Sequence, residues 1–241
     1  MTPLLSVEGV TKRFRGLTAV NNVSFAVPLG AIFAVIGPNG AGKTTLFNMI
    51  AGVFRPDGGT ITFAGERIDG ETPDAVCRRG IGRTFQLVRP FPGMTVEDNV
   101  IVGALLRRQY VGDARGHAHE LLRRLELYDK RHQLAAGLTL PDRKRLEVAR
   151  ALATDPKLLL LDEVMAGLRP TETDRMVAIL RDLNRGGLTI LLIEHVMRAV
   201  MALAGQILVL HHGASIAEGP PEAVVRDEAV INSYLGAEEI A

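Results

Sequence analysis

Short runs of apolar residues that are typical of β-strands occur toward both ends of the chain. Residues 4–10 and 23–27 alternate between apolar and polar positions, whereas residues 31–36 form a continuous apolar run followed by glycine. A continuous run of this length is typical of a buried strand that leads into a turn. Further strands are predicted at residues 60–64, 157–161, 189–193 and 206–210. We expect helices from Gly42 to about Ala51, from Thr171 and from His195, and this alternation predicts a mostly parallel sheet.

Residues 87–155 follow a different pattern, in which strand-like runs nearly vanish and leucines recur at helical spacing. Two segments in this region, Thr95-Val96-Glu97-Asp98 and Thr139-Leu140-Pro141-Asp142, fit the capping box that begins a helix. We therefore predict a single α/β domain with a core formed by residues 1–86 and 156–241 and a helical subdomain inserted at residues 87–155.

A glycine-rich loop joins the apolar run 31–36 to the first predicted helix. It contains the G-x4-G-K-[ST] pattern of a phosphate-binding loop, in the residues Gly37, Pro38, Asn39, Gly40, Ala41, Gly42, Lys43 and Thr44, and Thr45 follows as a further candidate nucleotide-binding residue. Glycines let successive N–H groups face one anion, and the helix start adds free donors and a positive dipole end. Lys43 is placed to reach the outer phosphates of a nucleotide, and the Thr44 hydroxyl to ligate Mg²⁺. A glycine-rich turn without function is the alternative, which the flanking strand and helix disfavour.

Two acidic residues follow the apolar run 158–161. Asp162 emerges at the C-terminal end of that predicted strand, where open α/β sheets bind ligands, and it can supply a second oxygen ligand for Mg²⁺. Glu163 is the next residue and can orient or deprotonate an attacking water. Two solvated acids at a strand end are the alternative, and the nearby phosphate loop makes it the weaker one.

Three further side chains are candidates for the same site. His195 follows the strand 189–193, so we expect it at the same edge of the sheet, in contact with the terminal phosphate. Gln86 ends the run 81–85 and can sense Mg²⁺ or water through its amide. Phe14 lies in the first hairpin and can stack on a nucleobase. The respective alternatives are a structural histidine, a surface glutamine and a core phenylalanine.

The overall composition excludes several classes of protein. The net charge is +1, from 28 basic and 27 acidic residues, so no global field favours nucleic acid or an anionic membrane. Basic clusters such as Arg107-Arg108 and Lys130-Arg131-His132 are interpreted as solvated helix faces. Cys77 is the only cysteine, which excludes an internal disulfide. No apolar run approaches the roughly 20 residues of a membrane helix, and no signal peptide is visible, so we expect a soluble, intracellular chain.

Together, these motifs resemble the ATP-binding domain of ABC transporters, over nearly the whole chain. In that family Phe14 falls at the adenine-stacking position, Gln86 in the glutamine loop and His195 at the switch histidine. Residues 166–170 look like the loop that crosses to a second subunit. The resemblance implies ATP and Mg²⁺ as ligands, ATP hydrolysis as the activity, and a P-loop, RecA-like core with N-terminal antiparallel strands. ATP is favoured over GTP because the chain contains no Asn-Lys-x-Asp sequence to recognise guanine.

Within that family, the chain looks most like the ATPase subunits of importers for branched-chain or hydrophobic amino acids, which include urea and amide relatives. The residues behind this resemblance are 11–20, 83–87, 217–219 and 233–236. The resemblance implies a chain at the cytoplasmic face of the membrane that associates with integral membrane permease subunits, and indirectly with a solute-binding protein. We expect the permease contact near Gln86 and at residues 87–99. No nucleic-acid partner is expected.

One segment departs from the family pattern. ABC ATPases usually carry Leu-Ser-Gly-Gly-Gln at a helix start, where the turn binds the terminal phosphate of ATP held by the other subunit. The corresponding residues, called the signature turn below, are Leu138, Thr139, Leu140, Pro141 and Asp142. Thr139 should cap the helix, but Pro141 removes a backbone donor and Leu140 adds a side chain. We expect Asp142 to place negative charge near the phosphate, and the basic residues 143–145, which could offset it, to point in different directions.

Because two such domains pair head-to-tail in this family, the altered signature turn predicts two unequal ATP sites. The phosphate loop of this chain, completed by a partner's regular signature, would form the competent site. The sequence therefore favours a heterodimer with a second, different ATP-binding subunit over a homodimer. Two other functions are alternatives. A non-transport ABC ATPase is disfavoured because no second domain or coiled-coil arm is visible, and a non-hydrolysing, ATP-gated regulator because Lys43, Asp162 and Glu163 are intact.

Overall fold

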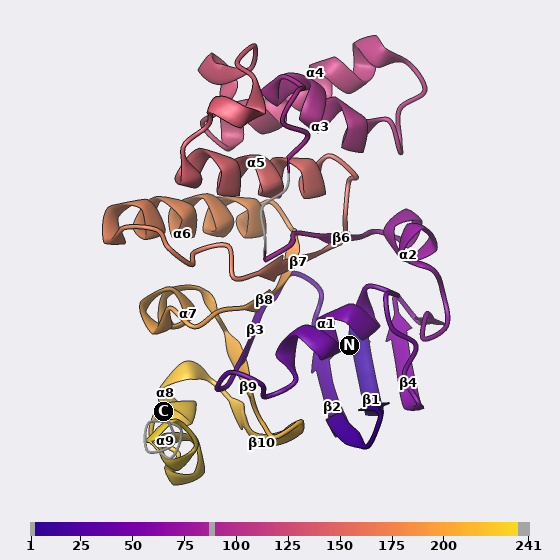
Figure 1. The fold of residues 1–241 in the computed structure, drawn as a ribbon, viewed down its shortest axis with the longest axis vertical. Coiled ribbons are helices and arrows are strands. Elements are labelled where there is room, and N and C mark those ends of the chain that lie inside the picture. Colours follow the sequence, from indigo (N-terminus) through magenta and orange to yellow (C-terminus); the bar gives the residue numbers. More distant parts are fainter. Residues whose placement is uncertain (1–2, 87–89, 236–241) are drawn as a thin grey trace.

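A computed structural model describes residues 3–86 and 90–235, whose strands form two sheets flanked by helices (Figure 1). A four-stranded sheet comes from the N-terminal part of the chain, and a six-stranded sheet collects strands from both sides of the helical region. Leu87 and Gly236, which belong to segments singled out in the sequence, lie outside the described residues.

The four-stranded sheet is antiparallel and has the order β2-β1-β4-β5. Its strands are β1 (Leu5–Phe14), β2 (Leu17–Val27), β4 (Gly58–Phe63) and β5 (Glu66–Arg67). This confirms the expected N-terminal antiparallel strands. β1 and β2 are longer than the alternating runs at 4–10 and 23–27, because shifts in their pairing register interrupt the alternation.

The six-stranded sheet has the order β10-β9-β3-β8-β7-β6. Its strands are β3 (Ile32–Ile36), β6 (Ile81–Arg83), β7 (Leu158–Asp162), β8 (Thr189–Ile193), β9 (Gln206–His211) and β10 (Ala214–Gly219). All its pairings are parallel except that of β10 with β9, which confirms a mostly parallel sheet. β10 was not predicted, because an edge strand of small and polar residues has little hydrophobic pattern.

Three of the predicted helices follow strands of this sheet: α1 (Lys43–Ile50) leads from β3 to β4 of the other sheet, α6 (Pro170–Arg185) connects β7 to β8, and α7 (Met197–Leu203) connects β8 to β9. The predicted starts of two of them were wrong. α6 is capped one residue earlier than expected, since the Arg169 N–H donates to the Glu172 carboxylate at 2.8 Å and Pro170 takes the first helical position. α7 begins two residues after His195, which leaves that histidine in the loop after β8. Sequence patterns did not predict α2 (Pro73–Arg79), α8 (Pro221–Val224) and α9 (Glu228–Leu235).

The helical region between β6 and β7 contains α3 (Val96–Ala104), α4 (Val111–Arg124) and α5 (Leu140–Leu152), stacked at the top of Figure 1. Two short 3-10 turns, Tyr128–Lys130 and Ala135–Gly137, connect α4 to α5. Thr95 and Thr139 cap α3 and α5 through their side chains, as predicted. The exact subdomain boundaries at 87 and 155 stay a prediction. Within residues 3–86 and 90–235, no helix combines the length and apolar character needed to span a membrane.

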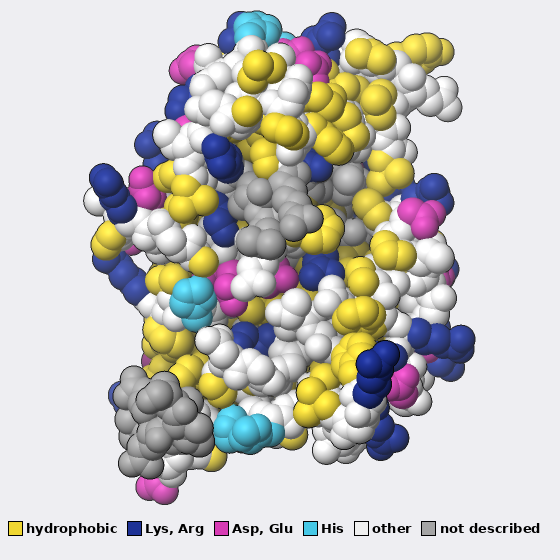
Figure 2. All heavy atoms as spheres, in the orientation of Figure 1, with side chains coloured by type: hydrophobic (Ala, Val, Ile, Leu, Met, Phe, Trp, Pro, Cys, Tyr) yellow, Lys and Arg dark blue, Asp and Glu magenta, His cyan; other side chains and the backbone are white. Residues whose placement is uncertain are grey.

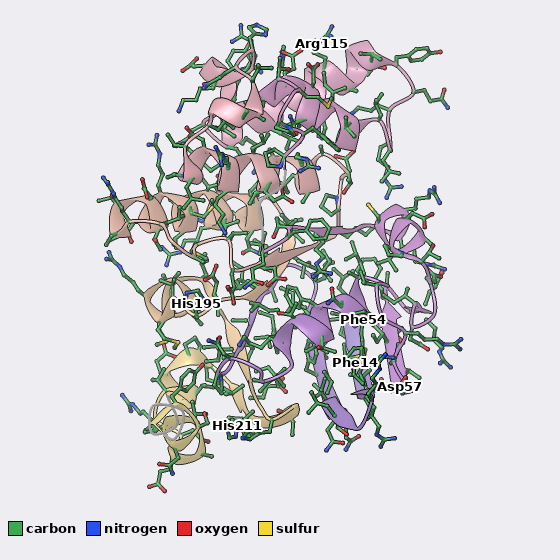
Figure 3. All side chains as sticks on the ribbon, in the orientation of Figure 1. Phe14, Phe54, Asp57, Arg115, His195 and His211 are labelled. Carbon is green, nitrogen blue, oxygen red and sulfur yellow. The ribbon has the colours of Figure 1, made fainter. Side chains whose placement is uncertain are left out.

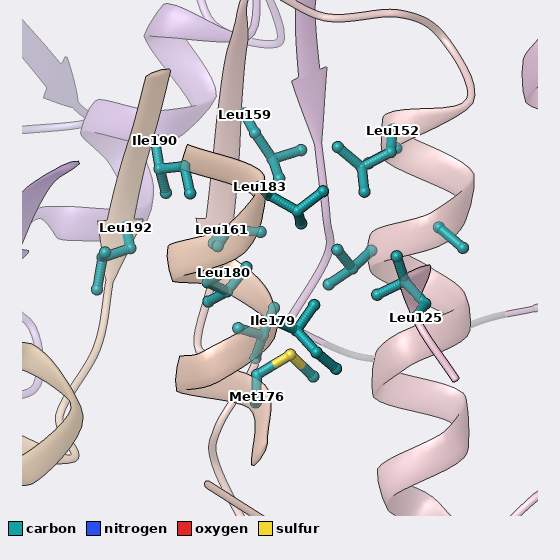
Figure 4. Close-up of a cluster of buried hydrophobic side chains, with 14 of the residues drawn as sticks. Leu125, Leu152, Leu159, Leu161, Met176, Ile179, Leu180, Leu183, Ile190 and Leu192 are labelled. Atoms are coloured by element: carbon teal, nitrogen blue, oxygen red, sulfur yellow. The ribbon is translucent and has the colours of Figure 1, made fainter. Parts of the chain in front are cut away.

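The six-stranded sheet separates two hydrophobic clusters. Every residue of β7 is buried, and successive side chains serve opposite faces. Leu159 and Leu161 join the cluster that α5 and α6 cover (Figure 4). Leu158 and Leu160 join the cluster shared with α1 and the four-stranded sheet. Because both faces of the sheet are covered, its central strands are continuous apolar runs.

Replacing Leu159 by alanine should therefore leave a cavity beside α6. We expect Leu159→Ala to lower the free energy of unfolding by about 2–5 kcal/mol, measured by urea denaturation. Leu29→Ala is the matched control, because Leu29 is 69% exposed, and it should change stability by less than about 0.5 kcal/mol. Equal stability of the two variants would contradict the placement of Leu159 in the core.

Candidate nucleotide-binding site

The phosphate loop, residues 37–42, connects β3 to α1. Gly37 and Gly42 have φ angles of 145° and 98°, which residues with a side chain rarely adopt. The loop is also tightly enclosed. A Cβ atom at Gly37 would lie 2.1 Å from the Leu210 carbonyl oxygen, and one at Gly42 would lie 2.3 Å from that of Ala19. Conformation and space therefore both require glycine at these two positions.

Lys43 begins α1 and folds its side chain back over the loop. Its Nζ donates to the carbonyl oxygens of Gly37 at 2.7 Å and Pro38 at 2.9 Å. Burial lowers the pKa of this ammonium, and the nearby carboxylates of Glu163 and Asp162 oppose that shift. The side chain is thus a fixed group at the centre of an anion-binding loop.

A cavity of about 430 Å³ opens beside the loop. It is lined by residues 39–45 and by side chains from distant segments: Phe14, Leu17, Thr18, Ala19, Gln86, Glu163 and His212. Phe14 is 38% exposed, and its ring meets that of Phe54 edge-on, with the centroids 5.3 Å apart (Figure 3). Phe14 is not a core residue, so that alternative interpretation is wrong. An accessible aromatic ring at the edge of a cavity is suited to stacking on a planar ligand.

Gln86 and His195 both approach the carboxylate of Glu163. Gln86 Nε2 donates to Glu163 Oε2 at 2.9 Å, and His195 Nδ1 lies 3.8 Å from the same oxygen. The His195 side chain is 57% exposed, so it is not a buried structural histidine. Glu163 has a left-handed φ of 50°, and its N–H donates to the Ile193 carbonyl at 2.9 Å. The structure therefore brings together three of the side chains that the sequence singled out.

Asp162 lies behind this group, at the end of β7. It is 2% exposed, and its Oδ2 lies 3.4 Å from Arg83 Nη2. Among the residues that the structure describes, none donates a hydrogen bond to its Oδ1. Burial raises the pKa of the carboxyl group, against the opposing effect of Arg83. A buried carboxylate oxygen without a donor fits a cation ligand, so Asp162 suits Mg²⁺ together with the oxygens of Thr44 and Gln86.

Sequence patterns missed three residues near the site. Lys144 of α5 donates from Nζ to the Glu163 carbonyl at 2.9 Å. Glu194 accepts the Met165 N–H at 2.8 Å. His212, in the turn between β9 and β10, lines the cavity with a positive φ of 48°. The only sequence signal for Lys144 was its place in the basic run 143–145, which does not show the direction of its side chain.

Comparison with known proteins identifies the family. The sequence model of the ABC transporter family matches residues 20–166, and that of the branched-chain amino acid ATP-binding cassette transporters matches residues 215–240. The chain is 42% identical to the high-affinity branched-chain amino acid transport ATP-binding protein LivG of Salmonella typhimurium, across 97% of this chain and 98% of that protein. The chain belongs to the ABC transporter family. It is the ATP-binding part of such a transporter, an ATPase whose hydrolysis of ATP drives transport.

A second curated relative and a solved structure support the same family assignment for this ABC ATPase. It is 39% identical to the corresponding protein BraF of Pseudomonas aeruginosa, over 97% of this chain and 98% of that one. The crystal structure of the ADP conformation of MJ1267, an ATP-binding cassette of an ABC transporter, superposes with a TM-score of 0.91 at 30% identity, covering 98% and 100% of the two chains. The family and the fold class predicted from the sequence are confirmed.

The signature turn of this ABC ATPase differs from the prediction. Asp142 was expected to direct its charge toward a phosphate, but it is 2% exposed and faces inward. Its carboxylate accepts hydrogen bonds from Lys130, Arg145 and, at 2.8 Å, the Thr139 hydroxyl. Burial would raise the pKa of this carboxyl group, but these donors outweigh it and hold the pKa below its ordinary value. Lys130, which the sequence analysis interpreted as part of a solvated helix face, therefore pairs with a buried carboxylate. Arg145, which was expected to point in a different direction from its neighbours, does neutralise Asp142.

The signature turn also lies away from the nucleotide cavity. Thr139, Pro141 and Asp142 line a separate cavity of about 220 Å³, together with residues of α6 such as Glu172 and Arg175. None of the residues of the signature turn lines the cavity beside the phosphate loop. The signature turn and the phosphate loop of this chain therefore line two different cavities.

We expect Asp142→Asn to lower the free energy of unfolding at pH 7 by about 1.5–3 kcal/mol, the range for hydrogen bonds to a charged group. Because the folded-state pKa lies below the ordinary value of 3.8, the stabilisation is complete above that value. It is lost as the pH falls through the lower folded-state pKa. Urea denaturation should therefore show a constant difference between wild type and variant from about pH 7 to pH 5, and a shrinking one below about pH 4.

Asp129→Asn is the control for this series, since Asp129 is an exposed acid next to Lys130. It should change stability by less than about 0.5 kcal/mol at every pH. A difference for Asp142→Asn that persists undiminished at acid pH would show that the ion pairs do not stabilise the turn.

Proposed function

We propose that this chain binds ATP with Mg²⁺ beside the phosphate loop and hydrolyses it through Glu163, to energise the uptake of branched-chain amino acids. The observation that carries the proposal is the position of the Glu163 carboxylate. It shares one cavity with Lys43 and Thr44 of the loop and accepts a hydrogen bond from Gln86. A carboxylate next to a phosphate-binding loop is suited to orient or deprotonate water.

The loop and its surroundings would bind the nucleotide. The amides of residues 37–42 and the N-terminus of α1 would hold the phosphates, with the Lys43 ammonium on the outer ones. Phe14 would stack on the adenine ring from the first hairpin, where its ring is accessible. Thr44, Gln86 and Asp162 would hold Mg²⁺, which neutralises developing phosphate charge when it is bound.

Glu163 would direct the hydrolytic step. Its carboxylate would orient a water and accept a proton as the water oxygen bonds to the terminal phosphorus. The bond from that phosphorus to the bridging oxygen then breaks, which releases ADP and phosphate. His195 lies 3.8 Å from the Glu163 carboxylate and would contact the terminal phosphate as charge shifts onto its oxygens.

The solute class is proposed from the relatives. The names of LivG and BraF both describe high-affinity branched-chain amino acid transport. The match of residues 215–240 to branched-chain amino acid cassettes supports the same class. Hydrophobic amino acids and related amides are included in the proposal. Selection of the solute would belong to a solute-binding protein and to the permease.

A groove of about 290 Å³ between α2, β6, α3 and α5 is the proposed contact with integral membrane permease subunits. Its lining includes exposed hydrophobic side chains, namely Val53, Phe85, Phe91 and Val102. Figure 2 shows hydrophobic side chains gathered on the upper part of this face, near the helical region. Phe85 directly precedes Gln86, which donates a hydrogen bond to Glu163. A permease that displaced Phe85 would therefore also change the position of Gln86 relative to the Glu163 carboxylate. The chain would then lie at the cytoplasmic face of the membrane.

The sequence predicted the permease contact near Gln86 and at residues 87–99. Residues 87–89 of that range lie outside the described residues.

We propose that the second ATP-binding subunit is a different chain. The signature turn has its anionic side chain already neutralised by Lys130 and Arg145. Pro141 lacks an N–H, and Leu140 is 45% exposed at the point where a phosphate would need close approach. The phosphate loop of this chain would therefore be completed by the regular signature of a different partner.

The Glu163→Gln variant tests both parts of this proposal. It should bind ATP but lose turnover by about 10²–10⁴-fold, measured as phosphate release from the assembled transporter. After size exclusion with light scattering, the purified variant should stay a monomer with ATP-Mg²⁺. Changing Leu140 and Pro141 to glycine in the same variant should permit an ATP-dependent dimer, since two obstacles to phosphate contact are removed.

Glu222→Gln is the matched control, because Glu222 is an exposed acid on α8, and it should keep wild-type turnover. Undiminished turnover of Glu163→Gln would show that another group activates water. An ATP-dependent dimer of Glu163→Gln with the native signature turn would show that a homodimer suffices.

Val102→Asp tests the groove. Val102 is 45% exposed on α3, and a carboxylate there should reduce recovery of co-purified permease by about tenfold or more, equal to at least about 1.4 kcal/mol of binding. ATP affinity should not change. Val111→Asp is the control, since Val111 is 51% exposed on α4 and outside the groove. Equal permease recovery with both variants would place the contact elsewhere.

A further inference from the structure

Lys144 is a buried charged side chain to which the proposed reaction assigns no role. It lies in the second turn of α5, shortly after the signature turn, and is 5% exposed. Burial lowers the pKa of its ammonium, and the carboxylates of Glu194, Glu163 and Asp162 oppose that shift. A lysine is rarely this buried unless it is paired and hydrogen-bonded.

The single hydrogen bond described for Lys144 ends on the backbone of Glu163, where its Nζ donates to the carbonyl oxygen at 2.9 Å. The same carbonyl accepts the Ala166 N–H at 3.2 Å, and the Glu163 N–H donates to the Ile193 carbonyl at 2.9 Å. Glu163 is held at φ 50°, a conformation that residues other than glycine, asparagine and aspartate seldom adopt. Such a conformation persists only where surrounding contacts determine it.

Glu194 secures the other side of the same turn. It is 1% exposed, and its Oε1 accepts the Met165 N–H at 2.8 Å. Its Oε2 has no hydrogen-bond partner within residues 3–86 and 90–235. Of the carboxylates around Lys144, Glu194 has the strongest electrostatic effect on it. The turn of residues 163–166 is therefore hydrogen-bonded to the Lys144 ammonium of α5 and to the Glu194 carboxyl group that follows β8.

We propose that Lys144 is a positioning residue, which holds the Glu163 backbone so that its carboxylate meets Gln86 and the nucleotide cavity. This inference rests on the proposed role of Glu163 as the group that activates water.

The test is Lys144→Met, which keeps most of the length of the side chain and removes its donor. In the assembled transporter, kcat should fall between about 10- and 100-fold, because small displacements of a reacting group have effects of this size. The affinity for ATP and its KM should stay within about threefold of wild type. In a Glu163→Gln background, adding Lys144→Met should change the residual turnover by less than about twofold, since the group it positions is already absent.

Two more variants separate positioning from folding. Lys144→Gln keeps an N–H donor and should recover most of the lost kcat. Lys157→Met removes an exposed lysine from the other end of β7 and should behave as wild type. A wild-type kcat for Lys144→Met, or an equal loss in the Glu163→Gln background, would overturn the inference while leaving the role of Glu163 intact. Wild-type turnover of Glu163→Gln alone would instead remove the proposed function on which the inference rests.

Discussion

The close packing of the phosphate loop against two strands is the constraint on which the rest of the structure depends. Gly37 touches the backbone of β9 in one sheet, and Gly42 touches the backbone of β2 in the other, with no room for a Cβ at either contact. The Ala41 carbonyl also accepts the Gly213 N–H at 3.1 Å, which ties the β9–β10 turn to the loop. The loop thereby joins both sheets and fixes the cavity into which both contribute side chains.

The parallel pairing of β7 with β8 brings charged groups together, because the carboxyl ends of both strands lie at the same edge of the sheet. Asp162 and Glu194 are both buried carboxyl groups, and each has one oxygen that receives no hydrogen bond from the part of the chain that the structure describes. Burial raises the pKa of Glu194 to about 7. Lys144 and Arg83 supply nearby positive charge, and these cations reduce the cost of holding several carboxylates together in a poorly solvated region. A site with this much internal charge is arranged before the nucleotide arrives.

The signature turn shows how a motif can change without losing its fold. Asp142 takes the place of a neutral residue, yet Thr139, Lys130 and Arg145 satisfy its carboxylate inside the protein. The helix therefore starts in the expected place while its surface differs from that of the regular motif. Such a turn is better explained as a stable structure of its own than as a damaged phosphate site, and this supports a pairing with a different subunit.

The sequence by itself determined the phosphate loop, the buried strands and the two threonine caps, because each depends on residues that are near one another in the chain. The order of its motifs also determined the family. Only the tertiary structure decided that Phe14 is accessible, that Asp142 turns inward and that Lys144 reaches the Glu163 backbone. The direction of a side chain on α5 depends on what packs against that helix, and those neighbours come from segments far away in the sequence. Hydrophobic periodicity carries no information about them.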